Sequence, residues 1–139
     1  MKIYIRASQS NTSANPFYDM NCEKITNASI KKYKTQYKQL SHVRVSANTK
    51  GYLYLINGKV QAMINTEDKG GVIWIQGLEI FGASKGKGYS KYLLDIAVSN
   101  LGATHLSVNK NNTTAKHVYD KYGFEVYDED NNMYYMMLS

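Results

Sequence analysis

The chain has very little cysteine and lacks any apolar run long enough to cross a membrane. Its single cysteine, Cys22, excludes an intramolecular disulfide and a metal site built from several cysteines. Nucleophilic catalysis by Cys22 requires a histidine beside it, so we expect an ordinary thiol in a reducing compartment. The stretch Met1–Ala7 alternates between residue types and does not form a signal-peptide core. These absences predict a cytoplasmic protein with no membrane-spanning segment.

Length and composition favour one folded domain over residues 1–139. A chain of 139 residues buries about 70% of its unfolded surface, and 43% of its residues are hydrophobic against 20% charged, which excludes general disorder. The net charge of +6 suits an anionic ligand, a nucleic acid or an acidic partner. Thirteen tyrosines interleaved with lysines also suit stacking on single-stranded nucleic acid. Most of them fall at core-facing periods, so nucleic-acid binding is the minor alternative.

A glycine- and lysine-rich stretch is the central feature of the sequence. Ser84–Ser90 reads Ser-Lys-Gly-Lys-Gly-Tyr-Ser, between an apolar run at 72–81 and helical spacing of apolar residues over 93–101. Strand, glycine-rich turn and helix direct backbone N–H groups and a helix dipole at one spot, where an anion binds. The lysines near this helix start, which would disfavour the helix without a bound anion, are Lys85, Lys87 and Lys91. The spacing matches neither a Walker loop nor a dinucleotide fingerprint, and a solvated basic turn is the alternative.

Hydrophobic periodicity predicts an alternation of strands and helices. Strands are expected at 2–7, 52–56, 60–64, 72–81, 104–109, 124–127 and 133–138. Helices are expected after a cap at Thr26 or Asn27 through Leu40, after the glycine-rich stretch up to Gly102, and around 115–122 up to Gly123. Turns or loops are expected at 8–16, 57–59, 67–71 and 128–132. This order predicts an α/β (α+β) fold: a mixed, mostly antiparallel sheet of about six to seven strands with helices on both faces.

The apolar run at 72–81 carries two further expectations. It is apolar on both alternating faces, which is typical of a central strand covered from both sides. Gly77 interrupts it, and a glycine inside a strand marks a bulge or a close approach of a ligand to the backbone.

The order of elements and two motifs resemble the GNAT superfamily of N-acetyltransferases. That family has a Gln/Arg-x-x-Gly-x-Gly/Ala pyrophosphate loop between a strand and a helix, and later an Asn-x-x-Ala…Tyr…Gly-Phe segment. Here the loop is Lys85–Ser90, and the later segment runs from Asn112 to Phe124. The resemblance covers 78–138 well, and before Gly51 it extends only to element order. It implies acetyl-CoA as the co-substrate and no metal.

Three positions depart from the family pattern. Lys85 stands in place of glutamine or arginine, and Ser90 in place of the second glycine or alanine. Lysine keeps the charge without the bidentate fork, and serine is still small, so we expect weakened cofactor binding. Ser107 stands where members that act on protein N-termini have a glutamate base, which argues against that class of acceptor.

The resemblance assigns roles to individual residues. The residues implied in cofactor binding are Ile80, Phe81, Lys85, Gly86, Lys87, Gly88, Tyr89, Ser90 and Asn112. The Ile80 N–H would stabilise the oxyanion on the thioester carbonyl, and Asn112 would face the cofactor arm or serve only as a helix cap. Tyr119, seven residues after Asn112, would protonate the departing thiolate, although its place in an apolar stripe also suits the core.

An acceptor amine must also lose a proton. Glu79, at the end of the strand beside the thioester, is the named candidate for the general base, against a purely structural carboxylate. His105 and His117 are weaker candidates, with His117 expected on the solvated side of its helix. The predicted activity is acetyl transfer from acetyl-CoA to a primary amine, on a small molecule or a protein lysine, by a monomer or homodimer. The alternatives are a non-catalytic acyl-CoA-binding module and a basic nucleic-acid-binding domain.

Overall fold

The computed structural model describes residues 21–82 and 85–139. The described part contains one seven-stranded sheet in the order β1-β2-β3-β4-β5-β7-β6. Its strands are β1 (Asn21–Lys24), β2 (Thr49–Ile56), β3 (Lys59–Lys69), β4 (Val72–Ile80), β5 (His105–Asn109), β6 (Glu125–Glu129) and β7 (Met133–Met137). Its helices are α1 (Asn27–Tyr33), a 3-10 helix η3 (Lys38–His42), α2 (Tyr89–Asp95), a π-helical turn η5 (Ile96–Asn100) that continues α2, and α3 (Thr113–Tyr122).

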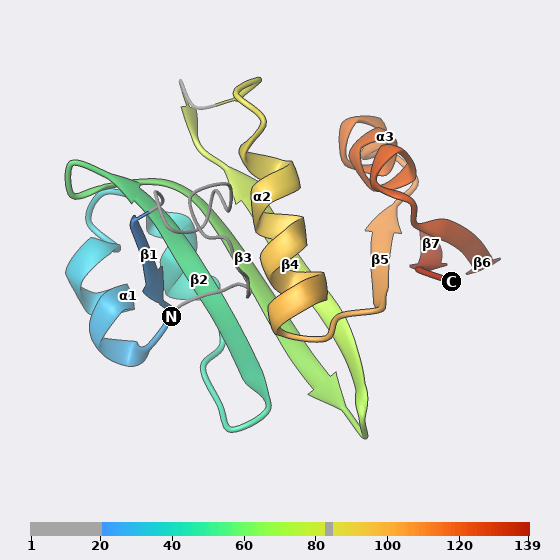
Figure 1. Cartoon of the computed structure of the whole chain (residues 1–139), viewed down its shortest axis with the longest axis horizontal. Coiled ribbons are helices and arrows are strands. Elements are labelled where there is room, and N and C mark those ends of the chain that lie inside the picture. Colours follow the sequence, from blue (N-terminus) through green and yellow to red (C-terminus); the bar gives the residue numbers. More distant parts are fainter. Residues whose placement is uncertain (1–20, 83–84) are drawn as a thin grey trace, which may run out of the picture.

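The predicted fold class is confirmed. All neighbouring strands are antiparallel except β4 and β5, which are parallel. Two cores lie on opposite faces of the sheet: one beneath α2 and α3, the other beneath α1 and η3. Figure 1 shows α2 lying across β3 and β4, with α3 beside β5 and β7. The strand predicted at 2–7 and the loop at 8–16 lie outside the described residues.

The hairpin at residues 57–59 is confirmed. Asn57 and Gly58 have φ of 52° and 76°, the left-handed values that a tight turn of this type requires. The next turn is shorter than predicted, because β3 continues through Lys69 and only Gly70 and Gly71 remain between β3 and β4. Their φ values of 68° and 94° explain the two glycines.

The first predicted helix is correct at its start and wrong at its end. Thr26 caps α1: its side chain accepts from Ser29 N–H while the Ser29 hydroxyl accepts from Thr26 N–H. The helix ends at Tyr33, and Tyr37 and Leu40 belong to the separate η3 turn. Both segments still direct these apolar side chains to the same core. The periodicity therefore identified the buried face, although one continuous helix was wrong.

β4 is central in the sheet but not covered on both faces. Of its nine residues only Ile75 is buried, which corrects the prediction of a doubly covered strand. The alternative given for Gly77, a bulge, is confirmed, because the partners on β3 step from Thr66–Ile75 to Asn65–Gly77 and leave Gln76 extra. The exposed flanks of β4 border the cavities described below.

The described tyrosines mainly build the cores. All of them pack in or against one of the two cores except Tyr127 and Tyr135. Within the described residues, no helix combines the length and apolar character needed to cross a membrane.

Gly51 in β2 is where the sheet is least able to accept a side chain. A Cβ there would clash with the carbonyl oxygen of Ile64 and lie 2.9 Å from Ile25 Cδ1. We predict that Gly51→Ala lowers the free energy of unfolding by about 1–3 kcal/mol, measured by urea denaturation. Gly77→Ala is the matched control, because no atom lies within 4 Å of its Cβ position. Equal urea midpoints for the two variants would contradict the packing described for β2.

Candidate functional site

The sheet opens between β4 and β5. The two strands pair only at Trp74–His105 and Ile75–Leu106. After the extra residue Gln76, β4 continues along β3 to Ile80 and makes no further pairing with β5 in the described part of the chain. The carboxyl-terminal ends of the two parallel strands therefore separate and leave a cleft.

A cavity of about 390 Å³ occupies this cleft. The end of β4, the turn before α2, the start of α2, the β5–α3 loop and α3 form its walls. Its lining residues are Leu78, Glu79, Ile80, Lys85, Gly86, Gly88, Tyr89, Ser90, Asn112, Thr114, Ala115, Val118 and Tyr119.

The start of α2 presents backbone N–H groups without a capping side chain. Thr26 caps α1 and Asn112 caps α3, whereas the N-cap position of α2 is Gly88, which has no side chain to offer. Gly86 and Gly88 have φ of 81° and 80°, where an L-residue is strained. The helix dipole and unsatisfied N–H groups make this end of the cleft attractive to an anion.

Two of the three lysines remain unpaired beside this helix start. Lys91 makes an ion pair with Asp95 at 3.0 Å, one helical turn further on. Lys85 and Lys87 are exposed and have no ion pair with any described residue. Only Lys85 reaches the cavity wall. The positive charge at the cavity wall therefore comes from Lys85 and the helix dipole, with Lys87 close by in sequence but outside the wall.

The end of β4 directs one backbone N–H into the opening. Phe81 N–H donates to the Gln61 carbonyl oxygen on β3 at 2.9 Å. Because consecutive residues of a strand point their N–H groups to opposite edges, Ile80 N–H faces away from β3, toward the β5 side. A donor in that position can stabilise negative charge developing on an oxygen in the cleft.

Tyr119 brings a buried phenol to the cavity from α3. Its residue is only 8% exposed, and its hydroxyl makes no hydrogen bond with any described residue. Burial, and secondarily the Glu79 carboxylate, raises the pKa of Tyr119 to about 12. Tyr119 therefore belongs both to the core and to the cleft, and its hydroxyl stays protonated at neutral pH.

Glu79 and Asn112 border the same cavity. Glu79 is exposed and lies close enough to Tyr119 for their charges to interact. Asn112 Oδ1 accepts from Ala115 N–H at 3.1 Å, so the cap role is present. Asn112 is also one of the residues that line the cavity. The two interpretations of Asn112 are compatible.

Some predicted site residues lie elsewhere. The Phe81 side chain is buried in the core beneath α1, stacked on Tyr37 with ring centroids 4.3 Å apart, and Lys87 lies outside the cavity wall. Ser107 and His105 are not among the cavity residues, and His117 is exposed on α3. Of the cavity residues, sequence reasoning missed Leu78, Thr114, Ala115 and Val118. The helical spacing of 115 and 118 was visible, but it indicated only a core face.

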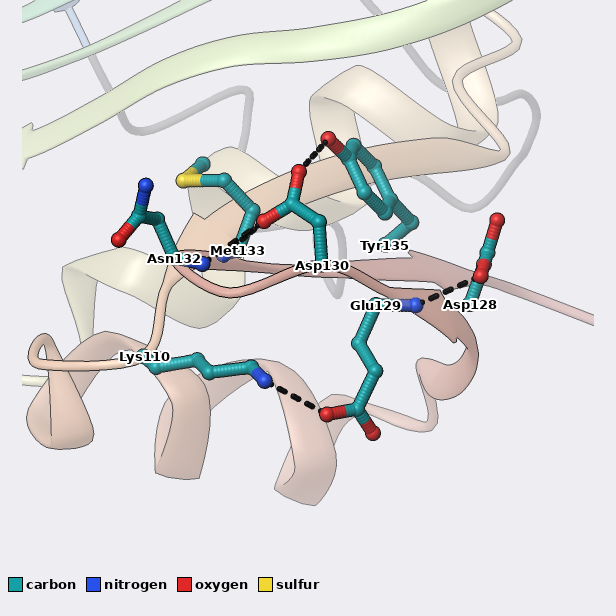
Figure 2. Close-up of polar contacts among 7 residues, drawn as sticks. All are labelled: Lys110, Asp128, Glu129, Asp130, Asn132, Met133 and Tyr135. Carbon is teal, nitrogen blue, oxygen red and sulfur yellow. Dashed lines mark hydrogen bonds and ion pairs between the residues drawn. The ribbon is translucent and has the colours of Figure 1, made fainter.

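Contacts outside the cavity hold its α3 wall. Tyr122 donates to Asp95 Oδ1 at 2.6 Å, which joins α3 to α2. Lys110, just before the α3 cap, contacts Glu129 on β6 at 2.6 Å, as Figure 2 shows. Asp130 organises the following turn by accepting from the Tyr135 hydroxyl and from backbone N–H groups. The acidic turn is therefore structural, and it begins two residues later than predicted because β6 runs through Glu129.

Comparison with known proteins agrees with this geometry. A family model described as an acetyltransferase (GNAT) domain matches residues 19–134. No protein of curated function matches the sequence.

Solved structures share the fold. The Campylobacter jejuni N-acetyltransferase PseH in complex with acetyl coenzyme A superposes with a TM-score of 0.62 at 19% identity, covering 86% of this chain and 98% of that one. The ribosomal-protein-S18-alanine N-acetyltransferase from Escherichia coli superposes with a TM-score of 0.68 at 15% identity, covering 86% and 92%. A streptothricin acetyltransferase structure from Bacillus anthracis, also with acetyl coenzyme A, gives 0.60 at 17% identity, covering 70% and 66%.

Proposed function

Because the chain belongs to the GNAT acetyltransferase domain family, we propose that it transfers an acetyl group from acetyl-CoA to a primary amine. The observation that carries this proposal is the cleft between β4 and β5, which combines an uncapped helix start with a buried, unpartnered phenol. A pyrophosphate would fit the first feature and a sulfur leaving group the second. Structural relatives were solved with acetyl coenzyme A, which supports this choice of co-substrate.

The chain's own groups would divide the chemistry as follows. The N–H groups from Gly86 to Ser90 and the Lys85 ammonium bind the pyrophosphate. As the amine attacks the thioester carbon, Ile80 N–H stabilises the charge on the carbonyl oxygen. Tyr119 then donates its proton to the departing sulfur while the carbon–sulfur bond breaks. The second proton, which the nitrogen loses as it becomes an amide, restores the phenol.

Deprotonation of the acceptor is the remaining requirement. An amine of pKa about 10.4 costs roughly 4 to 5 kcal/mol to deprotonate at pH 7. We assign Glu79 as the acceptor of this proton, because its carboxylate lies at the cavity wall beside Ile80. Its exposure gives the proton a direct route to solvent.

Acetyl-CoA binding and turnover test the function together. We predict that acetyl-CoA at about a hundred times its dissociation constant stabilises the protein by roughly 2.7 kcal/mol, seen as a higher melting temperature. Addition of amines should then release free thiol, detected with a thiol reagent. Stabilisation without thiol release across a broad amine panel would indicate a non-catalytic binding module. Neither effect, with binding to single-stranded nucleic acid instead, would reject the proposal.

Gly88→Glu tests the pyrophosphate assignment. The carboxylate would add bulk and negative charge at the helix start, so acetyl-CoA affinity should fall at least 100-fold, measured by calorimetry. The matched control is Gly70→Glu, because Gly70 has a similar φ of 68° and equally open surroundings. Gly70 lies in the β3–β4 turn. Figure 1 shows this turn at the opposite end of β4 from the start of α2. Equal affinities in the two variants would remove the assignment.

The variant Tyr119→Phe tests whether Tyr119 is the general acid that protonates the departing sulfur. Phenylalanine keeps the ring in the core and removes only the proton donor. We expect kcat to fall by about 100-fold while acetyl-CoA affinity changes little. Full turnover in a folded variant would show that Tyr119 serves packing alone.

A further inference from the structure

A second cavity lies on the other side of β4 from α2. Its volume is about 220 Å³. β3 contributes Met63, Asn65 and Glu67, which alternate onto the face that α1 covers. The bulge of β4, the end of η3 with the two residues after it, and the start of β2 at Thr49 complete its walls.

Asn65 places an unpartnered amide in this cavity. Three polar residues are buried in the described part, and Asn65, at 8% exposure, is the one whose side chain makes no hydrogen bond there. Ser29 takes part in the α1 capping box, and the Thr66 hydroxyl donates to the Lys50 carbonyl oxygen at 2.9 Å. A buried amide without a partner destabilises a fold, so its presence calls for a reason. A ligand that bonds to the amide would supply one.

Gly77 places no side chain at the end of this cavity that adjoins the cleft between β4 and β5. It pairs with Asn65 in the β3–β4 register, so a side chain at 77 would project beside the amide. No atom lies within 4 Å of its Cβ position, and its backbone needs no left-handed φ. The next residue, Leu78, already lines the first cavity, in the cleft between β4 and β5 where acetyl-CoA is proposed to bind. Glu79 lies two residues beyond Gly77 on the same face of β4, roughly 6.5 Å further along the strand.

Glu67 supplies a negative charge among the residues that line this cavity, and its ion pair with Arg44 is weak. Arg44 and Glu67 form an ion pair at 2.7 Å, with side-chain exposures of 68% and 19%. An ion pair with so exposed a guanidinium contributes little, so another cation can replace Arg44. The less exposed Glu67 carboxylate would then attract the ammonium form of an acceptor.

We propose that this cavity binds the acceptor, and that the acceptor is a small amine carrying a hydroxyl or amide group. This rests on the proposed acetyltransferase function and names its substrate class. Glu67, opposite Trp74, attracts the ammonium form of the acceptor to the cavity. In the bound acceptor, Asn65 bonds the hydroxyl or amide group beside Gly77. The amine then lies further along β4, at Glu79 and the thioester. A protein lysine fits less well, because its stem of four methylene groups would leave the Asn65 amide without a partner.

Matched amines test the substrate class. Glucosamine and cyclohexylamine both carry a primary amine on a six-membered ring, and only glucosamine carries hydroxyls. Its amine is also less basic, so kcat/KM is compared per concentration of unprotonated amine. We expect the wild-type protein to show a kcat/KM at least 10-fold higher for glucosamine, because a site built for hydrogen bonds discriminates against analogues without them. A preference for cyclohexylamine or for a lysine-containing peptide would overturn the proposal.

Two variants then test the residues. Asn65→Leu removes the unpartnered amide and keeps the number and branching of the side-chain heavy atoms, so the melting temperature should rise while the preference for glucosamine falls toward unity. Gly77→Leu should reduce kcat/KM for glucosamine at least 100-fold with acetyl-CoA affinity within twofold of wild type. Val72→Leu is the control, because it adds a leucine to β4 at an exposed position outside both cavities.

The outcomes separate the two proposals. A wild-type protein that binds no acetyl-CoA removes the acetyltransferase function itself. If acetyl-CoA binding and amine turnover persist but Gly77→Leu acts like Val72→Leu, the cavity is not the acceptor site. If the Asn65→Leu variant has a lower melting temperature than the wild type and keeps the preference for glucosamine, the Asn65 amide stabilises the fold and does not bind the acceptor. If that variant does not fold, Gly77→Leu still decides.

Discussion

Parallel strands that stay hydrogen-bonded leave no room between them, and here β4 and β5 stay paired for only two residue pairs. The extra residue Gln76 ends that pairing by shifting β4 relative to β3. β4 keeps its antiparallel partner β3 along its whole length, so the backbone stays supported on one edge while the other edge opens. The N–H of Ile80 is exposed to the cleft for the same reason.

The two helices that flank the opening are held by different means. α2 is anchored by Leu93 and Leu94, which are almost wholly buried against the sheet, so it can leave its first turn uncapped. α3 buries less, and its position depends more on polar contacts. The Tyr122–Asp95 hydrogen bond joins it to α2, and burial together with this bond raises the pKa of Tyr122. The cleft is therefore bounded by one wall fixed through apolar burial and one adjusted by hydrogen bonds.

Local signals in the sequence predicted the features that local chemistry determines. Asn57-Gly58 specifies a left-handed turn, Thr26 supplies a cap, and the glycines before α2 permit positive φ. Features that depend on the partner strand were not readable. The exposure of β4 follows from its early separation from β5, and the burial of Phe81 follows from its stacking on Tyr37. The cavity at Asn65 combines residues from four segments, within 42–44, at 49, within 63–67 and at 76–77. Only Gly77 signalled it, through the suggestion that a ligand approaches there.

Burial of Tyr119 has two opposite effects on the proposed proton transfer to sulfur: it keeps the phenol protonated, and it makes the phenol a weaker acid. A phenol with a pKa of about 12 is always protonated when needed. Transfer of that proton to a thiolate of ordinary pKa near 8.5 would be uphill by roughly 4 to 5 kcal/mol. The departing thiolate, however, forms near the apolar side chains that line the cavity with Tyr119, namely Leu78, Ala115 and Val118, and desolvation there raises a thiol pKa as well. Negative charge on the sulfur also strengthens its hydrogen bond to the phenol. The same burial that weakens the acid therefore strengthens the base it must meet, so Tyr119 can act without an ionised neighbour to lower its pKa.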